Sequence, residues 1–119
     1  MVRILLSLAL LLFTYALPLS AKIIYVNQNA AGLNNGNSWP DAFTSLHAAL
    51  TTAQYGDQIW VAKGIYYAYM PGVTNSFNIV NGAKLYGGFS GTEAALTQRN
   101  MSGNETILSG LSTPPFRVP

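Results

Sequence analysis

Cysteine is absent from the 119-residue chain, histidine occurs once, and charged residues make up only 8% of the sequence. Without cysteine, the chain can form neither disulfides nor thiolate metal sites. Beyond residue 21 the few basic and acidic side chains nearly balance, and the basic ones form no cluster. Because nucleic-acid binding needs a basic patch or stripe, the sequence predicts no nucleic-acid partner.

The apolar residues are concentrated at the start of the chain, where Arg3 precedes an apolar run over residues 4–17. Pro18 breaks this run, and Ala21 offers a small side chain at a cleavage position. A basic start, an apolar core of roughly 7–15 residues and a small-residue site are the ordered parts of an export signal. The alternative is an uncleaved anchor, since a membrane span needs roughly 17–25 apolar residues.

The polar and helix-breaking residues at the end of the run favour cleavage over an anchor. We therefore expect residues 1–21 to be a signal peptide, with the mature chain starting near Lys22. The mature protein is then secreted or held at the cell surface or outer envelope, and it meets a membrane only through the signal segment.

The next part of the chain, residues 22–57, is expected to form a strand, a loop and a helix. The β-branched and aromatic residues Ile23–Val26 predict the strand. A loop rich in Asn and Gly follows over residues 28–38. From Phe43 to Ala53 apolar residues recur at helical spacing and predict a helix with one apolar stripe.

Short apolar segments punctuated by glycine fill residues 58–119 and predict further strands. The expected strands are Gln58–Ala62, Phe77–Val80, Ala83–Gly87 and Thr106–Ser109. The Asn81-Gly82 pair is compatible with a hairpin turn or with a corner between successive coils of a solenoid. Ile59, Leu85 and Ile107 recur at intervals within the roughly 20–50 residue periods of solenoids. An ordinary β-sandwich fragment is the alternative fold.

Three segments together resemble the opening of secreted right-handed parallel β-helix proteins of the pectin-lyase-like superfamily. They are Gly56-Asp57 before a strand, Gly64-Ile65-Tyr66 after it, and Gly87-Gly88-Phe89 downstream. The resemblance also takes in residues 25–27 and 35–43 and covers nearly all of the mature chain. It implies a mainly β fold, the start of a right-handed parallel β-helix with an N-terminal capping α-helix over its open end.

Residues 58–119 would then be the first β-helix coils. Solenoids need roughly three or more repeats for stability, and the chain holds about two, so we expect it to be the N-terminal piece of a longer protein. The resemblance implies export together with carbohydrate-related or adhesive functions.

No residue is assigned a catalytic, cofactor-binding or metal-binding role, and no cofactor is expected. His47 lies beside the predicted helix stripe, and Asp41 and Asp57 lie at element boundaries, where turn formation explains them. A glycosidase needs two carboxylates that face the same bond of the sugar, and nothing in the sequence places Glu93 and Glu105 in one such site.

Aromatic side chains are the remaining candidates for binding. Most of the strand aromatics are expected to pack against one another. Tyr66, Tyr67 and Tyr69 fall in a predicted loop after the first coil and are the candidates for stacking on sugar rings.

The sequence therefore favours a non-catalytic structural or adhesive scaffold that contacts extracellular polysaccharide or cell-surface components. The alternatives are the N-terminal fragment of a polysaccharide-degrading lyase or hydrolase, and a carbohydrate-binding module.

Overall fold

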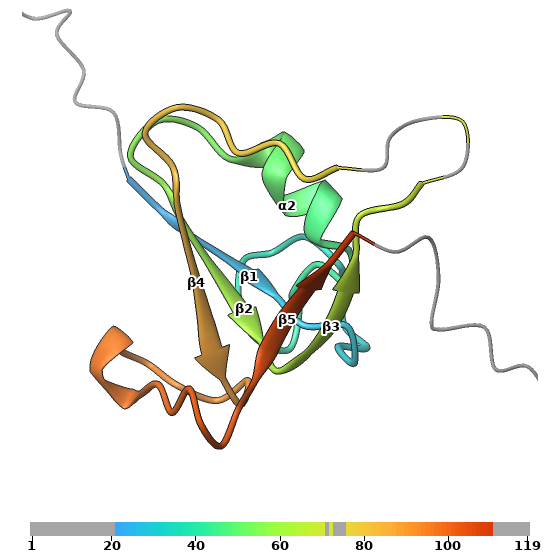
Figure 1. Cartoon of the computed structure of the whole chain (residues 1–119). Helices are drawn as coiled ribbons and strands as arrows, with labels where there is room; N and C mark the ends of the chain where they lie inside the picture. Colours follow the sequence, from blue (N-terminus) through green and yellow to red (C-terminus); the bar gives the residue numbers. More distant parts are fainter. Residues whose placement is uncertain (1–20, 71, 73–75, 111–119) are drawn as a thin grey trace, which may run out of the picture.

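A computed structural model describes residues 21–70, 72 and 76–110 of the chain (Figure 1). Within these ranges the fold is mainly β, with short strands, one α-helix and one 3-10 turn. In chain order the elements are β1 (Ile23–Val26), α2 (Leu46–Thr52), β2 (Gln58–Ala62), β3 (Gly64–Tyr67), β4 (Lys84–Phe89), η2 (Leu96–Gln98) and β5 (Thr106–Ser109). The expected signal peptide, apart from Ala21, and the segment after Gly110 lie outside the described residues.

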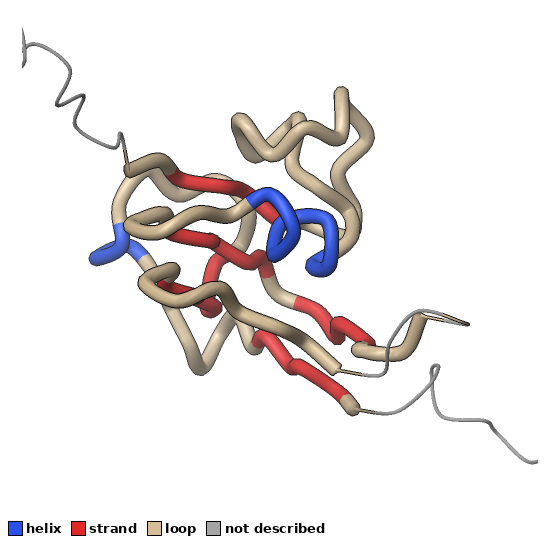
Figure 2. The backbone as a smooth tube through the Cα atoms, turned by 90° about the horizontal axis from the view of Figure 1, so that it is seen from above, coloured by secondary structure: helices blue, strands red, loops and turns tan. Residues whose placement is uncertain are grey.

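The strands form two parallel sheets, one in the order β1-β2-β4 and the other pairing β3 with β5. Ile59 lies opposite Leu85 in the first sheet, and Ile65 lies opposite Ile107 in the second. From β2 onward, successive strands alternate between the two sheets, so that β2 and β3 form one layer and β4 and β5 form the next (Figure 2). The predicted parallel pairing is confirmed.

Glycines make two features of this path possible. Gly64 begins β3 directly after the corner from β2, with φ of 139°, and a side chain there would collide with Gln28. In β4 the register shifts between the partners of Trp60 and Ala62, so that Gly87 and Gly88 oppose one residue of β2. Gly88 has φ of 88°, which glycine adopts without strain, and this bulge bends the strand.

Side chains alternate between the two faces of the first sheet, and each face contributes to a hydrophobic cluster. Ile24, Val26, Ile59 and Val61 point into an aliphatic cluster that Leu46, Ala49 and Leu50 of α2 complete. The intervening residues of β2, Trp60 and Ala62, point the other way into an aromatic cluster. We call these the inner cluster and the aromatic cluster.

Helix α2 is shorter than predicted: it begins at Leu46 rather than at Phe43 and ends at Thr52. Phe43 instead pairs with the outer edge of β1, where its N–H donates to the Tyr25 carbonyl and its carbonyl accepts from Asn27 N–H, both at 2.9 Å. Since Gly36 also accepts from Tyr25 N–H, the Asn- and Gly-rich loop covers the edge of β1. The helix itself packs against β1 and β2.

The strand predicted at Phe77–Val80 is not formed. Ile79 and Val80 are 49% and 40% exposed. The Val80 carbonyl accepts a hydrogen bond from Ala83 N–H and closes a turn into β4, but with no strand over residues 77–80 and β4 parallel to β2, this turn is not a hairpin. The strand predicted at Thr106–Ser109 is confirmed as β5, and because β5 belongs to the second sheet, Ile107 pairs with Ile65 and not with Leu85.

Candidate functional site

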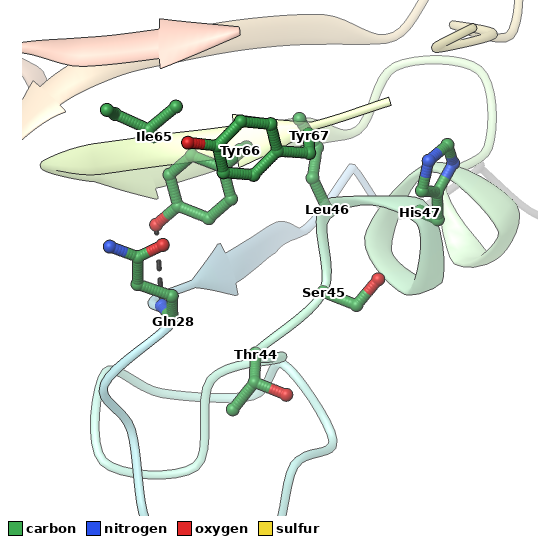
Figure 3. Close-up of a pocket in the computed structure, with 8 residues that line it drawn as sticks. All are labelled: Gln28, Thr44, Ser45, Leu46, His47, Ile65, Tyr66 and Tyr67. Carbon is green, nitrogen blue, oxygen red and sulfur yellow. Dashed lines mark hydrogen bonds between the residues drawn. The ribbon is translucent and has the colours of Figure 1, made fainter. Parts of the chain in front are cut away.

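A shallow pocket of about 210 Å³ lies between the start of α2, the loop after β1, and β3 (Figure 3). Its lining combines polar groups with aromatic rings: Gln28, Thr44, Ser45, Leu46, His47, Ile65, Tyr66 and Tyr67. The pocket therefore collects two of the three tyrosines singled out in the sequence. We call it the β3 pocket.

Tyr66 does not present an exposed ring, contrary to the sequence prediction, because residues 64–67 form a strand rather than a loop. The side chain is 4% exposed and belongs to the inner cluster. Its hydroxyl donates to the Ala62 carbonyl at 2.9 Å and accepts from Gln28 N–H at 3.4 Å. Burial raises the pKa of Tyr66, and the hydrogen bond from Gln28 opposes that rise.

The other two tyrosines are more accessible. Tyr67 is half-buried and lines the β3 pocket, whereas Tyr69 lies beyond the end of β3 and is 41% exposed. Only Tyr67 therefore combines an accessible ring with neighbouring polar groups, which is the arrangement that sugar stacking needs.

His47 is fixed at the rim of the β3 pocket. Its Nε2 lies 2.8 Å from the Ala68 carbonyl and its ring stacks on Phe77 at 4.9 Å between centroids. Because a carbonyl can only accept, Nε2 carries the proton, and in the neutral ring Nδ1 is the acceptor. The histidine thus ties α2 to the segments on either side of residue 70.

The acidic residues stay apart and bind main-chain amides. Asp41 accepts from Leu33 N–H at 2.9 Å, which supports the predicted role in turn formation. Asp57 is buried at 2% exposure and accepts from the main-chain N–H groups of Lys22 and Gln54. Across the described ranges, no group of three His, Cys, Asp or Glu side chains lies close enough to hold a metal ion.

Glu93 organises the loop after β4. Partial burial raises its pKa, but hydrogen bonds from the N–H groups of Ser90, Thr92 and Gly91 outweigh this and lower the pKa to about 2. The main-chain carbonyl of Glu93 also accepts from Trp39 Nε1 at 2.8 Å. The carboxylate of Glu93 therefore holds the turn of residues 90–93 together, while its main-chain carbonyl ties this loop to Trp39 of the aromatic cluster.

The strand aromatics pack together, as predicted. Phe89 stacks on Trp60 with 4.8 Å between ring centroids and 11° between planes, and it contacts Trp39 at 5.4 Å. Tyr25 meets both tryptophans edge-on. These rings are used for packing and are not free to bind a ligand.

A second cavity, of about 170 Å³, opens between β4 and β5. Val61, Leu85 and Leu108 line it together with Gly87 and Thr106. Within the described residues β4 and β5 are each paired on one side only, and Ile107 and Leu108 are 39% and 44% exposed. We call this surface the β4/β5 end.

Sequence reasoning missed both cavities, because each depends on which strands share a sheet. The β3 pocket joins residues far apart in sequence. Within it, neighbouring side chains of β3 point to opposite faces, so that Tyr66 is turned inward and Tyr67 lies at the rim. Among the helices of the described ranges, none is long and apolar enough to span a bilayer.

Comparison with known proteins gave no relationship: no family model matches the chain, and neither the curated proteins nor the solved structures include a significant match.

Proposed function

We propose that the chain is the N-terminal part of an exported right-handed parallel β-helix protein and serves there as a non-catalytic scaffold. The observation that carries the proposal is the alternation of parallel strands between two sheets, β2 and β4 in one and β3 and β5 in the other. Two coils stacked in register would produce this pattern. Crossovers between parallel strands are right-handed in nearly all proteins, which sets the hand of the coil.

The two ends of the stack differ in a way that supports this role. At one end the loop of residues 27–43 hydrogen-bonds to the edge of β1 and α2 covers the inner cluster, which together form a cap. The β4/β5 end has an apolar cavity and exposed aliphatic side chains. Unpaired apolar edges promote aggregation unless they are covered, so we propose that a further coil covers this end.

The scaffold assignment rests on the contacts of the carboxylates, which bind main-chain groups of the protein itself. Asp41 and Asp57 hold main-chain amides, and Glu93 holds a loop, so these carboxylates serve local structure. Partners are then extracellular polysaccharide or other cell-surface components, and the export signal at residues 1–21 brings the protein to them.

To test this, the chain is expressed with its leader, its location is determined by cell fractionation, and the exported protein is assayed for polysaccharide cleavage. The scaffold role predicts recovery from the medium or the cell envelope, and no release of reducing or unsaturated ends from a panel of soluble polysaccharides. Catalytic release of either product would refute the scaffold role and favour the lyase or hydrolase. Recovery of the protein only inside the cell would refute export.

Carbohydrate binding is the second candidate function, because the β3 pocket places Tyr67 beside hydroxyl, amide and imidazole groups. If the Tyr67 ring stacks on a sugar, Tyr67→Ala should weaken glycan binding by about 1–3 kcal/mol, the size found for aromatic rings that stack on a ligand face, which is a loss of about fivefold or more. Tyr55→Ala is the matched control, since Tyr55 is 67% exposed and lies outside this pocket. Equal retention by the two variants would exclude the β3 pocket as a sugar site.

A further inference from the structure

The buried carboxylate of Asp57 marks the point where the first strand begins. It lies between α2 and β2 and is the charged side chain buried among the described residues, at 2% exposure. Its Oδ1 accepts a hydrogen bond from the main-chain nitrogen of Lys22 at 3.1 Å, and its Oδ2 accepts one from Gln54 N–H at 2.9 Å.

Lys22 is fixed from its other side as well, because its carbonyl accepts from Gln58 N–H at 2.9 Å. Ala21 and Lys22 are themselves exposed, so the peptide bond between them lies at the surface while the nitrogen of that bond contacts Asp57. The position of this nitrogen is therefore set by the fold.

Both partners of Asp57 in the described ranges are uncharged amides. A buried carboxylate is destabilising unless it is well hydrogen-bonded and paired with an opposite charge. A positive charge on the Lys22 nitrogen would supply that pairing without any movement of the chain.

The sequence pattern and the structure both single out the peptide bond between Ala21 and Lys22. The export-signal pattern places cleavage after the small residue Ala21, and the fold places the nitrogen released by that cleavage against Asp57. We propose that the Ala21–Lys22 bond is the processing site of the chain, and that Asp57 is the receptor for the α-ammonium group that processing creates.

The chemistry is the hydrolysis of one peptide bond by an export peptidase. The oxygen of a water molecule adds to the carbonyl carbon of Ala21, the bond to the Lys22 nitrogen breaks, and Ala21 leaves as a carboxylate. The nitrogen takes up the protons and becomes an ammonium group, which is charged at neutral pH because α-amino groups have pKa values of about 8. The hydrogen bond to Asp57 then becomes charge-assisted and roughly twice as strong.

Removal of the leader would thus stabilise the fold that it releases. This inference rests on the export signal in the proposed function, but it is independent of the scaffold role. A protein that is exported and begins at another residue would refute the processing site and leave export standing.

The first experiment is N-terminal sequencing of the exported protein, with intact mass as a check. The expected first residue is Lys22. A start at any other residue, or an uncleaved leader, would overturn the proposal.

The second experiment is a double-mutant cycle on the exported chain. One change adds Ala21 back as a single N-terminal residue, and the other is Asp57→Asn. With Asp57 present, the extension should lower the folding equilibrium constant about tenfold, since a charged hydrogen bond is replaced by a neutral one. In the Asp57→Asn background it should change that constant less than about twofold. Equal effects in the two backgrounds would contradict the pairing.

If Asp57→Asn prevents folding, the amine itself provides the readout on the unmutated chain. Acylation of the Lys22 α-amine, followed by mass spectrometry of its peptides, should be slower in the native protein than in urea by about tenfold or more. The ε-amine of the exposed Lys84 is the internal control and should change little. An α-amine that reacts as fast in the native state as in urea would refute its contact with Asp57.

Discussion

Replacing Phe89 with alanine tests how the aromatic cluster holds β4 against β2. Phe89 is fully buried, at 0% exposure. Its ring lies face to face with Trp60 at 4.8 Å and against Trp39 at 5.4 Å. The ring comes directly after the Gly87-Gly88 bulge, which is the feature that turns it toward the two tryptophans.

The expected loss has two parts. Truncation of a fully buried phenylalanine to alanine destabilises a protein by about 3–5 kcal/mol, through lost burial and the cavity left behind. Of this, aromatic stacking contributes roughly 0.5–1.5 kcal/mol per pair. Phe89→Leu keeps most of the volume and loses the stacking, so it should destabilise the fold by about 1–1.5 kcal/mol. Domains of this size have total stabilities of about 5–15 kcal/mol, so the alanine variant should lie near the limit of folding.

Urea unfolding followed by tryptophan fluorescence and by far-ultraviolet circular dichroism measures both variants. Trp60 and Trp39 report on the cluster directly, and the two signals should shift together. Leu33→Ala is the control, because Leu33 is 75% exposed and its truncation should change the free energy of unfolding by less than about 0.5 kcal/mol. A loss below about 1 kcal/mol for Phe89→Ala would refute the packing described for this face.

Three further predictions concern single residues. Gly88→Ala should destabilise the fold by about 1–2 kcal/mol because of its positive φ and the nearby Met101 side chain, whereas Gly110→Ala, in open space, should have almost no effect in the same urea titration. Tyr66→Phe removes the buried hydroxyl that donates to the Ala62 carbonyl and accepts from Gln28 N–H, and it should destabilise the fold by about 1–2 kcal/mol, against nearly zero for the exposed Tyr69→Phe; equal values would show that the hydroxyl is not used. Because the pKa of Glu93 is lowered, its carboxylate stabilises the fold fully above about pH 4.5, and this stabilisation is lost as the pH falls toward about 2. Thermal melts should therefore show a loss of about 1 kcal/mol of stability in acid, allowing for solvent screening, and Glu93→Gln should abolish this pH dependence.

The strands with β-branched residues could be predicted from sequence. Ile23–Val26 and Gln58–Ala62 form strands with the expected limits, and the parallel layering of Ile59 on Leu85 follows the predicted interval. These features are local or periodic, so composition and spacing are sufficient to reveal them.

The errors arise where long-range pairing decides the local structure. Phe43 has helical spacing to Leu46, but the backbone of Phe43 pairs with the free edge of β1, so the helix begins only at Leu46. Ile79 and Val80 are as β-branched as a strand requires, yet none of the strands in the described part of the chain pairs with them. Propensity measures how well a side chain suits a sheet, not whether a partner is present.

The candidate site was less predictable than the fold. Tyr66 and Tyr67 are adjacent and chemically alike, but in a strand they face opposite sides, and only the inner cluster determines which side is buried. The role of Asp57 at an element boundary was foreseeable, whereas its contact with Lys22 depends on β1 lying beside β2.

The most direct test of the account is the parallel register of β3 with β5. The chain has no cysteine, so a pair introduced by Ile65→Cys and Ile107→Cys forms a single possible disulfide. These two residues face each other across neighbouring strands and are both partly exposed, at 41% and 39%. Adjacent strands lie about 4.8 Å apart, within reach of a disulfide.

The comparison pair is Ile65→Cys with Leu108→Cys, which antiparallel pairing of these segments would favour and parallel pairing places on opposite faces. Parallel pairing of β3 with β5 predicts rapid, complete loss of free thiols on mild oxidation for the pair at positions 65 and 107, and persistence of free thiols for the pair at 65 and 108. The reverse result would contradict parallel stacking and, with it, the β-helix proposal.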